Sequence, residues 1–177
     1  MARLRYLEES ELPPRIAALL QGRPLLNIFR TLAHSETAGI GFLALGRALL
    51  AESDLDPKLR ELVILRVGSL SSGAYEIYQH KRLAKSAGLS EAEIAAALRE
   101  APDDNLPEPV RQVLAFVDSV VWEVKAPDPL YRAVAGQLAD KQMVELLLTI
   151  GFYMLVCRFL ENLEVDIESA GPSNAQS

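Results

Sequence analysis

The stretch RELVILR, residues 60–66, and the stretch YEIYQH, residues 75–80, decide the fold and point to a site. The first places a carboxylate, Glu61, inside an apolar helical run and so predicts its burial. The second spaces Glu76 and His80 four residues apart, on one face of a helix. A buried glutamate near a histidine is typical of proton-transfer sites. The same pattern also suits a glutamate that caps a helix, pairs with an arginine or lies at a subunit contact.

These two stretches predict a pair of antiparallel helices. Asp56 and Pro57 are a good N-cap and first residue for the helix that carries Glu61, and residues 71–73 (SSG) end it. Short connections favour antiparallel packing of the helices they join. Glu61, near the start of one helix, is then expected to approach His80, near the end of the other.

The rest of the chain also reads as helical, and the sequence predicts an all-α fold with no strand. Apolar spacing, prolines and capping residues place the other helices at 14–20, 25–51, from 91, 109–124, from 128 and from 140. Gly88 is expected to end the helix of His80, and Ser90 with Glu93 to form a capping box. We expect one domain over residues 1–168 and a disordered polar tail over 169–177.

The pattern of Glu61, the run GAYE at 73–76, His80 and the run GLS at 88–90 resembles the carboxymuconolactone decarboxylase family, which includes the alkylhydroperoxidase D-like proteins. The resemblance extends to residues 27–34, 55–61 and 147–162. It implies an alkylhydroperoxidase D-like helical bundle with a central antiparallel helix pair. It also implies a homo-oligomer, either a trimer or a hexamer.

The chain departs from the peroxidase branch of that family at the thiols. That branch carries a Cys-x-x-Cys pair upstream of the histidine, and those positions fall on Gly73 and Glu76. The only cysteine of the chain, Cys157, lies in an apolar run that favours an inert, protonated thiol. A dithiol peroxidase needs two neighbouring thiols, so we expect no such activity and favour decarboxylase-like chemistry.

Composition limits the partners and the compartment. The chain has 177 residues, 50% of them hydrophobic, and a formal net charge of −6. The negative charge argues against nucleic acid or an anionic membrane as a partner. One free cysteine and no signal-peptide pattern lead us to expect a cytoplasmic protein. Two histidines and one cysteine make a metal site improbable, and no dinucleotide or phosphate-loop motif occurs, so we expect cofactor-free chemistry.

Four further residues are candidates for binding a substrate. Arg158 and Asn162 are four apart in an apolar helix, where a buried arginine is expected to pair or to bind an anion. Arg158 therefore either anchors a substrate carboxylate or forms an ion pair with Glu61 or Glu161. Tyr75 lines a pocket or only packs, and His34 either takes part or belongs to the scaffold.

Two functions follow from these residues. The first is cofactor-independent decarboxylation or isomerisation of a small cyclic or unsaturated organic acid. Glu61, Glu76 and His80 are then the catalytic residues, with Glu61 and His80 as a proton relay and Arg158 as the anchor. The second is a non-catalytic or stress-linked oligomeric binding protein that has lost the dithiol. A pocket next to a perturbed Glu–His pair favours the enzyme, whereas a pocket filled by core side chains favours the binder.

Overall fold

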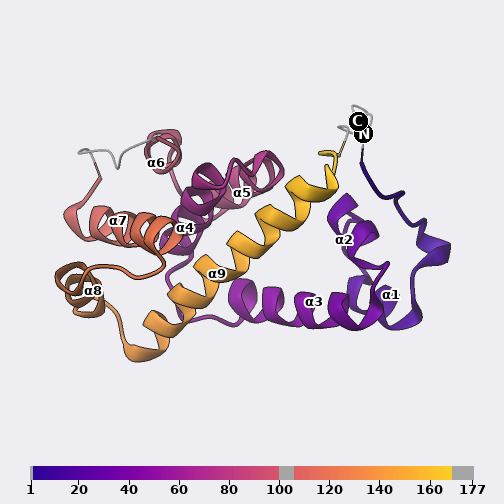
Figure 1. Cartoon of the computed structure of the whole chain (residues 1–177), viewed down its shortest axis with the longest axis horizontal. Helices are drawn as coiled ribbons and strands as arrows, with labels where there is room; N and C mark the ends of the chain where they lie inside the picture. Colours follow the sequence, from indigo (N-terminus) through magenta and orange to yellow (C-terminus); the bar gives the residue numbers. More distant parts are fainter. Residues whose placement is uncertain (1, 100–105, 169–177) are drawn as a thin grey trace. The chain divides into compact units, whose positions relative to one another are not determined.

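The computed structural model describes residues 2–99 and 106–168, and in them the chain forms helices joined by short connections, with no strand (Figure 1). The all-α expectation is therefore confirmed. The predicted tail over 169–177 and most of the loop before Pro107 lie outside the described residues. The chain divides into two compact units, residues 1–46 with 160–177 and residues 47–159.

The first unit contains the N-terminal helices and the C-terminal segment. It comprises η1 (Glu9–Glu11), α1 (Pro14–Leu20), α2 (Asn27–Leu32) and most of α3 (Glu36–Ala51). Its core consists of apolar residues of these elements and of the segment before them: Leu7, Leu12, Ile16, Leu20 and Ala33. The single helix predicted over 25–51 is wrong, because the chain turns at 33–35, where the amides of His34 and Ser35 bond to the carbonyls of Thr31 and Leu32.

The second unit contains the predicted helix pair. Its α4 (Pro57–Leu70) begins at Asp56, whose side chain accepts the amide of Leu59 at 3.0 Å. α4 is buried on every side from Glu61 to Gly68, so it is the central helix of this unit. α5 (Ala74–Ser86) follows after a short break, and Gly68 near the end of α4 lies against Ile77 near the start of α5. The pair is antiparallel, as predicted (Figure 1).

Further helices complete the second unit, and the first two of them pack on α4. They are α6 (Glu91–Ala97), α7 (Glu108–Glu123), α8 (Asp128–Ala135) and most of α9 (Asp140–Leu163). The capping box of Ser90 and Glu93 is present, and Gly88 ends α5 with a φ of 90°. A second unpredicted feature is the end of α7, where Val124 has a φ of 68°.

A buried arginine ties three of these helices together. Arg66 of α4 is fully buried and forms two parallel hydrogen bonds to Asp118 of α7, of 2.5 and 2.6 Å. Its remaining terminal nitrogen donates to the carbonyls of Ala97 and Arg99 at the end of α6. The bidentate geometry and the carbonyl partners satisfy the guanidinium, as a buried cation requires.

α9 is long and apolar, with a mean hydropathy of 1.9 over its most apolar window. By length and composition it is able to cross a bilayer, but half of that window is buried inside the protein. Partial burial of this kind is what the core helix of a globular protein shows.

Candidate functional site

His80 lies between two carboxylates. Its Nδ1 is 2.7 Å from Oε2 of Glu61, and its Nε2 is 3.3 Å from Oε2 of Glu76. Glu61 comes from the second turn of α4, whereas Glu76 and His80 come from consecutive turns of α5. The antiparallel pairing of α4 and α5 therefore brings the three predicted catalytic residues together. All three are at most 5% exposed.

The two carboxylates hold the imidazole in its charged form. Burial by itself lowers the pKa of His80, but hydrogen bonds to Glu61 and Glu76, together with their negative charges, outweigh burial and raise the pKa to about 9. At neutral pH His80 is then an imidazolium that donates from both nitrogens.

A tyrosine from α9 packs on the histidine and was missed by the sequence analysis. The rings of Tyr153 and His80 meet edge to face, with centroids 4.9 Å apart. Burial, reinforced by the charges of Glu76 and Glu61, raises the pKa of the Tyr153 hydroxyl well above its usual range. Tyr153 therefore remains a neutral hydrogen-bond donor beside the cluster. The only signal in the sequence was a tyrosine inside a long apolar run.

Arg60 supplies the second cation next to the cluster. Its Nε is 3.5 Å from Oε1 of Glu61, the carboxylate oxygen that His80 does not use, and its side chain is 13% exposed. Within the described residues this Nε is buried and has no hydrogen-bond partner. A buried N–H donor of a cation that has no hydrogen-bond partner lowers the stability of the fold. Arg60 was part of the opening motif, yet its role was not predicted.

The predicted anchor Arg158 is placed differently from the expectation. The interpretation assumed a buried arginine, but Arg158 is exposed on α9, and its Nη1 donates to the carbonyl of Met154 at 2.9 Å. It lies on the surface because residue 158 falls on the outward side of α9. Tyr75, by contrast, is buried beside Glu76 in the first turn of α5.

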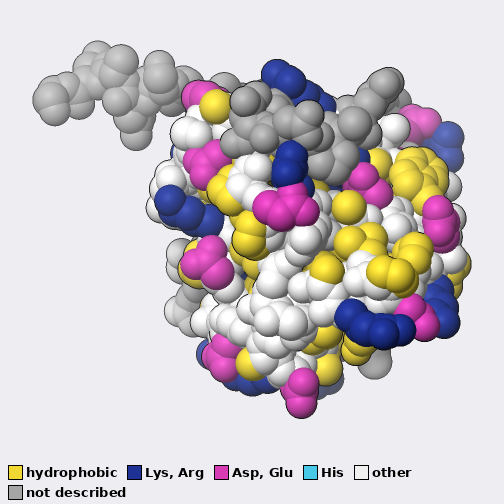
Figure 2. Space-filling model, turned by 90° about the vertical axis from the view of Figure 1, so that its left-hand side faces the viewer, with side chains coloured by type: hydrophobic (Ala, Val, Ile, Leu, Met, Phe, Trp, Pro, Cys, Tyr) yellow, Lys and Arg dark blue, Asp and Glu magenta, His cyan; other side chains and the backbone are white. Residues whose placement is uncertain are grey.

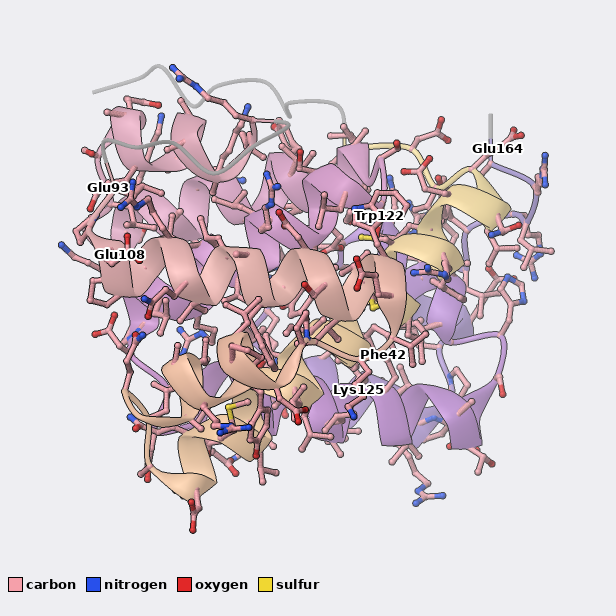
Figure 3. All side chains as sticks on the ribbon, turned by 60° about the vertical axis from the view of Figure 1, so that its left-hand side comes forward. Phe42, Glu93, Glu108, Trp122, Lys125 and Glu164 are labelled. Atoms are coloured by element: carbon pink, nitrogen blue, oxygen red, sulfur yellow. The ribbon has the colours of Figure 1, made fainter. Side chains whose placement is uncertain are left out.

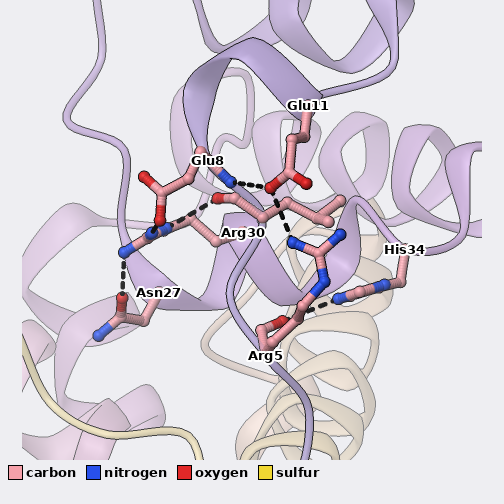
Figure 4. Close-up of polar contacts among 7 residues, drawn as sticks. Arg5, Glu8, Glu11, Asn27, Arg30 and His34 are labelled. Carbon is pink, nitrogen blue, oxygen red and sulfur yellow. Dashed lines mark hydrogen bonds and ion pairs between the residues drawn. The ribbon is translucent and has the colours of Figure 1, made fainter.

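His34 and Asn162 belong to the other compact unit. His34 is exposed, and its Nε2 lies 2.9 Å from the carbonyl oxygen of Arg5 (Figure 4). The backbone carbonyl of Asn162 accepts a hydrogen bond from Arg3. Both residues therefore help to hold the N-terminal segment within that unit. The cluster of Glu61, Glu76 and His80 belongs to the second unit.

Cys157 fills the space next to the start of α5. The thiol is buried, and a Cβ placed on Gly73 would lie only 2.7 Å from its sulfur. Any side chain at position 73 would therefore collide with Cys157. The chain thus holds one thiol, from α9, beside the position where the peroxidase branch carries its first cysteine.

No group of three or more His, Cys, Asp or Glu side chains within residues 2–99 and 106–168 has an arrangement suited to a metal ion. Surface cavities occur beside α1, lined by residues including Ala17 and Leu25, and between α7, α8 and α9. Neither of these two cavities is lined by Glu61, Glu76 or His80.

Several solved structures share this fold. A peroxidase-related protein with an alkylhydroperoxidase AhpD core from Ralstonia eutropha JMP134 is 18% identical, with a TM-score of 0.83 over 95% of this chain and 93% of that one. A peroxidase-related protein from Silicibacter sp. TM1040 is 16% identical, with a TM-score of 0.79 over 95% and 92%. The debrominase Bmp8, in a complex with 2,3,4-tribromopyrrole, is 17% identical, with a TM-score of 0.80 over 93% and 91%. At such identities the likeness shows the fold alone.

Comparison of the sequence with known families gives a match over part of the chain. Among curated proteins none matches the chain. Residues 38–119, which include α4, α5 and the whole cluster around His80, match the sequence profile of the carboxymuconolactone decarboxylase family. Residues 38–119 are therefore similar to that family, and the chain has the fold of the alkylhydroperoxidase D-like structures.

Proposed function

We propose that this protein catalyses cofactor-independent decarboxylation or isomerisation of a small cyclic or unsaturated organic acid, with His80 as the general acid. The observation that carries the proposal is the position of His80 between Glu61 and Glu76, which keeps the imidazole charged at neutral pH. A buried cation that can give up a proton suits protonation of carbon.

The two nitrogens of His80 have different tasks in this mechanism. The short contact of Nδ1 with Glu61 orients the ring, whereas the longer contact of Nε2 with Glu76 is the one that opens to the substrate. In a decarboxylation the bond to the substrate carboxylate breaks, carbon dioxide leaves and the electron pair remains as an enolate. Nε2 of His80 then gives its proton to the carbon, and solvent returns a proton to the histidine through Glu76. In an isomerisation the carboxylate of Glu76 first removes a proton from the substrate, and Nε2 of His80 then gives its proton to a different carbon.

Arg60 replaces Arg158 as the proposed anchor. Its Nε is buried, has no hydrogen-bond partner and lies next to Glu61, so a substrate carboxylate would satisfy it close to the proton donor. Tyr153 stays protonated and is available to donate to the enolate oxygen. In this mechanism Arg60 holds the substrate carboxylate, Tyr153 donates to the enolate oxygen and His80 protonates the carbon.

The alternative is a binding protein without turnover, and one observation favours it. Glu61, Glu76, His80 and Tyr153 are all nearly fully buried, which also suits a cluster that only stabilises the helix pair. The two functions differ in whether the proton of His80 reaches a ligand.

Small unsaturated and cyclic carboxylic acids should first be screened for those that raise the melting temperature of the protein. Each hit is then incubated in heavy water, and carbon dioxide release and deuterium on carbon are measured. We expect His80→Gln and Glu61→Gln to lower turnover by about 10²–10⁴-fold. Glu91→Gln, which removes an exposed carboxylate, should leave turnover unchanged. Hits that stabilise the wild type and the His80→Gln variant equally, with no deuterium incorporated, would favour the binding protein.

A further inference from the structure

Glu76 and His80 form a pair in which one group can accept a proton while the other donates one. Oε2 of Glu76 is 3.3 Å from Nε2 of His80, and the two side chains come from consecutive turns of α5. In an isomerisation that moves a double bond, a base removes a proton from one carbon and an acid protonates another carbon two bonds away. Those two carbons are about 2.5 Å apart. Two neighbouring groups on one helix face therefore suit both steps without a large movement of the substrate.

The proton balance of the two proposed reactions differs, and burial favours one of them. A decarboxylation replaces carbon dioxide by a proton, so each turnover takes one proton from solvent. An isomerisation takes none, because the proton that Glu76 receives from the substrate passes to Nε2 of His80 and restores both groups. Glu76 and His80 are each only 5% exposed, so a cycle that needs no proton from solvent suits them better.

The proposed anchor favours the same reaction. Arg60 would stabilise a bound carboxylate as an anion, whereas decarboxylation removes the negative charge from that carboxylate as carbon dioxide leaves. Binding that is stronger in the ground state than in the transition state slows a reaction. A carboxylate that stays on Arg60 throughout instead holds the reacting carbons in place, which speeds the proton transfers.

The charges of the cluster suit one substrate carboxylate and not two. The two glutamates of the cluster are balanced by His80 and Arg60, so a first substrate carboxylate already leaves one negative charge in excess. Arg66, a fully buried cation of the same helix as Arg60, is held by Asp118 and backbone carbonyls. A second buried carboxylate would therefore have no cation to pair with, which is strongly unfavourable.

Exposed cations elsewhere in the second unit are weaker sites for a carboxylate. Figure 2 shows Lys and Arg side chains interspersed with Asp and Glu on the side where α7 and α8 lie. On this side Lys125 and Arg132 lie 3.9 and 4.0 Å from Asp128, and Figure 3 shows Glu108 and Lys125 at the surface. Exposed charges of mixed sign attract an anion weakly, because water and salt screen them. The substrate carboxylate is therefore expected at Arg60.

The substrate also needs a carbonyl group. A carboxylate base removes a proton from carbon when that proton is acidic, as it is between a carbonyl and a C=C double bond. The negative charge then moves to the carbonyl oxygen, where a buried neutral donor stabilises it. Tyr153 is such a donor, because it is 3% exposed, keeps its proton and packs on the ring of His80.

We propose that the site moves the double bond of a small β,γ-unsaturated keto acid with a single carboxylate, which stays bound to Arg60. This inference rests on the proposed function and selects isomerisation from its two reactions. Glu76 takes a proton from the carbon between the carbonyl and the double bond, and the electron pair forms a dienolate whose oxygen accepts a hydrogen bond from Tyr153. Nε2 of His80 protonates the far carbon of the former double bond, which leaves the new double bond next to the carbonyl. The proton on Glu76 then returns to His80, so the cycle needs no co-reactant.

Two seven-carbon keto acids test the reaction. In 4-oxohept-6-enoic acid the double bond is one methylene away from the ketone, whereas 3-oxoheptanoic acid can lose carbon dioxide but has no double bond to move. Formation of the conjugated ketone is followed by NMR, and carbon dioxide release is compared with the spontaneous rate. We expect the wild type to isomerise the first acid and to leave the second at its spontaneous rate. Accelerated decarboxylation of the second acid without isomerisation of the first would overturn this inference and leave the proposed function standing, whereas neither reaction would overturn both.

Variants and an ester assign the groups. Glu76→Gln removes the base and should slow the isomerisation by about 10²–10⁴-fold, whereas Glu91→Gln, which removes an exposed carboxylate, should not change it. The methyl ester of the first acid lacks the negative charge, so the wild type should prefer the acid in kcat/KM by about tenfold or more. Arg60→Gln should bring acid and ester close to equal.

The comparison of acid and ester in the wild type does not depend on the folding of any variant, and circular dichroism checks the folding of the others. An ester that the wild type converts as efficiently as the acid would overturn the assignment of the carboxylate to Arg60. An isomerisation that is equally fast in the wild type and in Glu76→Gln would overturn the proposed proton transfer.

Discussion

Two arginines of α4, Arg60 and Arg66, lie in the same helix but in opposite situations. Arg66 is fully buried and donates to both oxygens of Asp118 and to two backbone carbonyls. Arg60 is nearly buried, yet its Nε has no hydrogen-bond partner in the described chain. This difference in hydrogen bonding indicates different roles for the two arginines. A cation that is fully satisfied by its own protein has nothing to offer a ligand, whereas an unmet buried donor does.

The largest expected effect is on stability at Arg66. Arg66→Gln leaves Asp118 and two carbonyls without their partner, and breaking a buried ion pair costs about 3–5 kcal/mol. Arg60→Gln should cost less than Arg66→Gln, because it breaks a longer ion pair with Glu61, of 3.5 Å, and no close hydrogen bond of its Nε. Urea denaturation followed by circular dichroism measures both. Equal losses of unfolding free energy would show that Arg60 is as structural as Arg66.

Measurements of substrate binding also distinguish Arg60 from Arg66. If Arg60 anchors an acid, Arg60→Gln should raise the KM for that acid, and Arg60→Lys should restore only part of the affinity, since lysine lacks the bidentate fork. The thermal shift produced by the acid should fall in step. A KM that does not change in Arg60→Gln would remove Arg60 from the binding site.

The next effect concerns the dependence of stability on pH. The pKa of His80 is about 9 in the folded protein against 6.5 for the free group. A raised pKa stabilises the fold fully below pH 6.5, and this contribution is lost as the pH rises through about 9. The loss amounts to at most about 3 kcal/mol. Unfolding free energies from pH 6 to pH 10 should show this decline in the wild type and not in His80→Gln.

The smallest effect concerns packing beside the site. Gly73→Ala pushes a methyl group to 2.7 Å from the sulfur of Cys157, and overpacking of this kind costs about 1–3 kcal/mol. Cys157→Ala should relieve most of that cost in the double variant. Cys157→Ser alone should leave turnover intact, because the thiol has no chemical role in the proposed mechanism. A Gly73→Ala variant as stable as the wild type would show that the packing between Gly73 and Cys157 is looser than the core around Arg66.

The parts of the fold that follow from local rules were predictable. Caps and breaks such as Asp56, Gly88 and Ser90 set helix ends through their own backbone, and the structure confirms them. The break after Leu32 was missed because Ala33, His34 and Ser35 include no glycine or proline. There the turn is stabilised by packing between helices, which a single sequence does not display.

The candidate site, like the fold, was predictable from the sequence only in part. Spacing placed Glu76 and His80 on one face, and the short connection between helices predicted their approach to Glu61. Tyr153 and Arg60 were missed, because periodicity gives the face of a helix and not its neighbours. Arg158 was expected to be buried but is exposed, since α9 has apolar residues on both its inner and its outer side, and the apolar pattern alone does not show which side faces outward.

The contact between Gly73 and Cys157 also constrains how this sequence can change. Restoring a cysteine at position 73 would be a first step back towards a dithiol, but the sulfur of Cys157 already fills the space that its Cβ needs. A smaller residue must therefore appear at position 157 before position 73 can accept any side chain. The order of the two substitutions is fixed by sterics, and a single mutation at position 73 meets a barrier that is unrelated to chemistry. A search for peroxidase activity by random mutagenesis of this chain should accordingly recover changes at 157 before changes at 73.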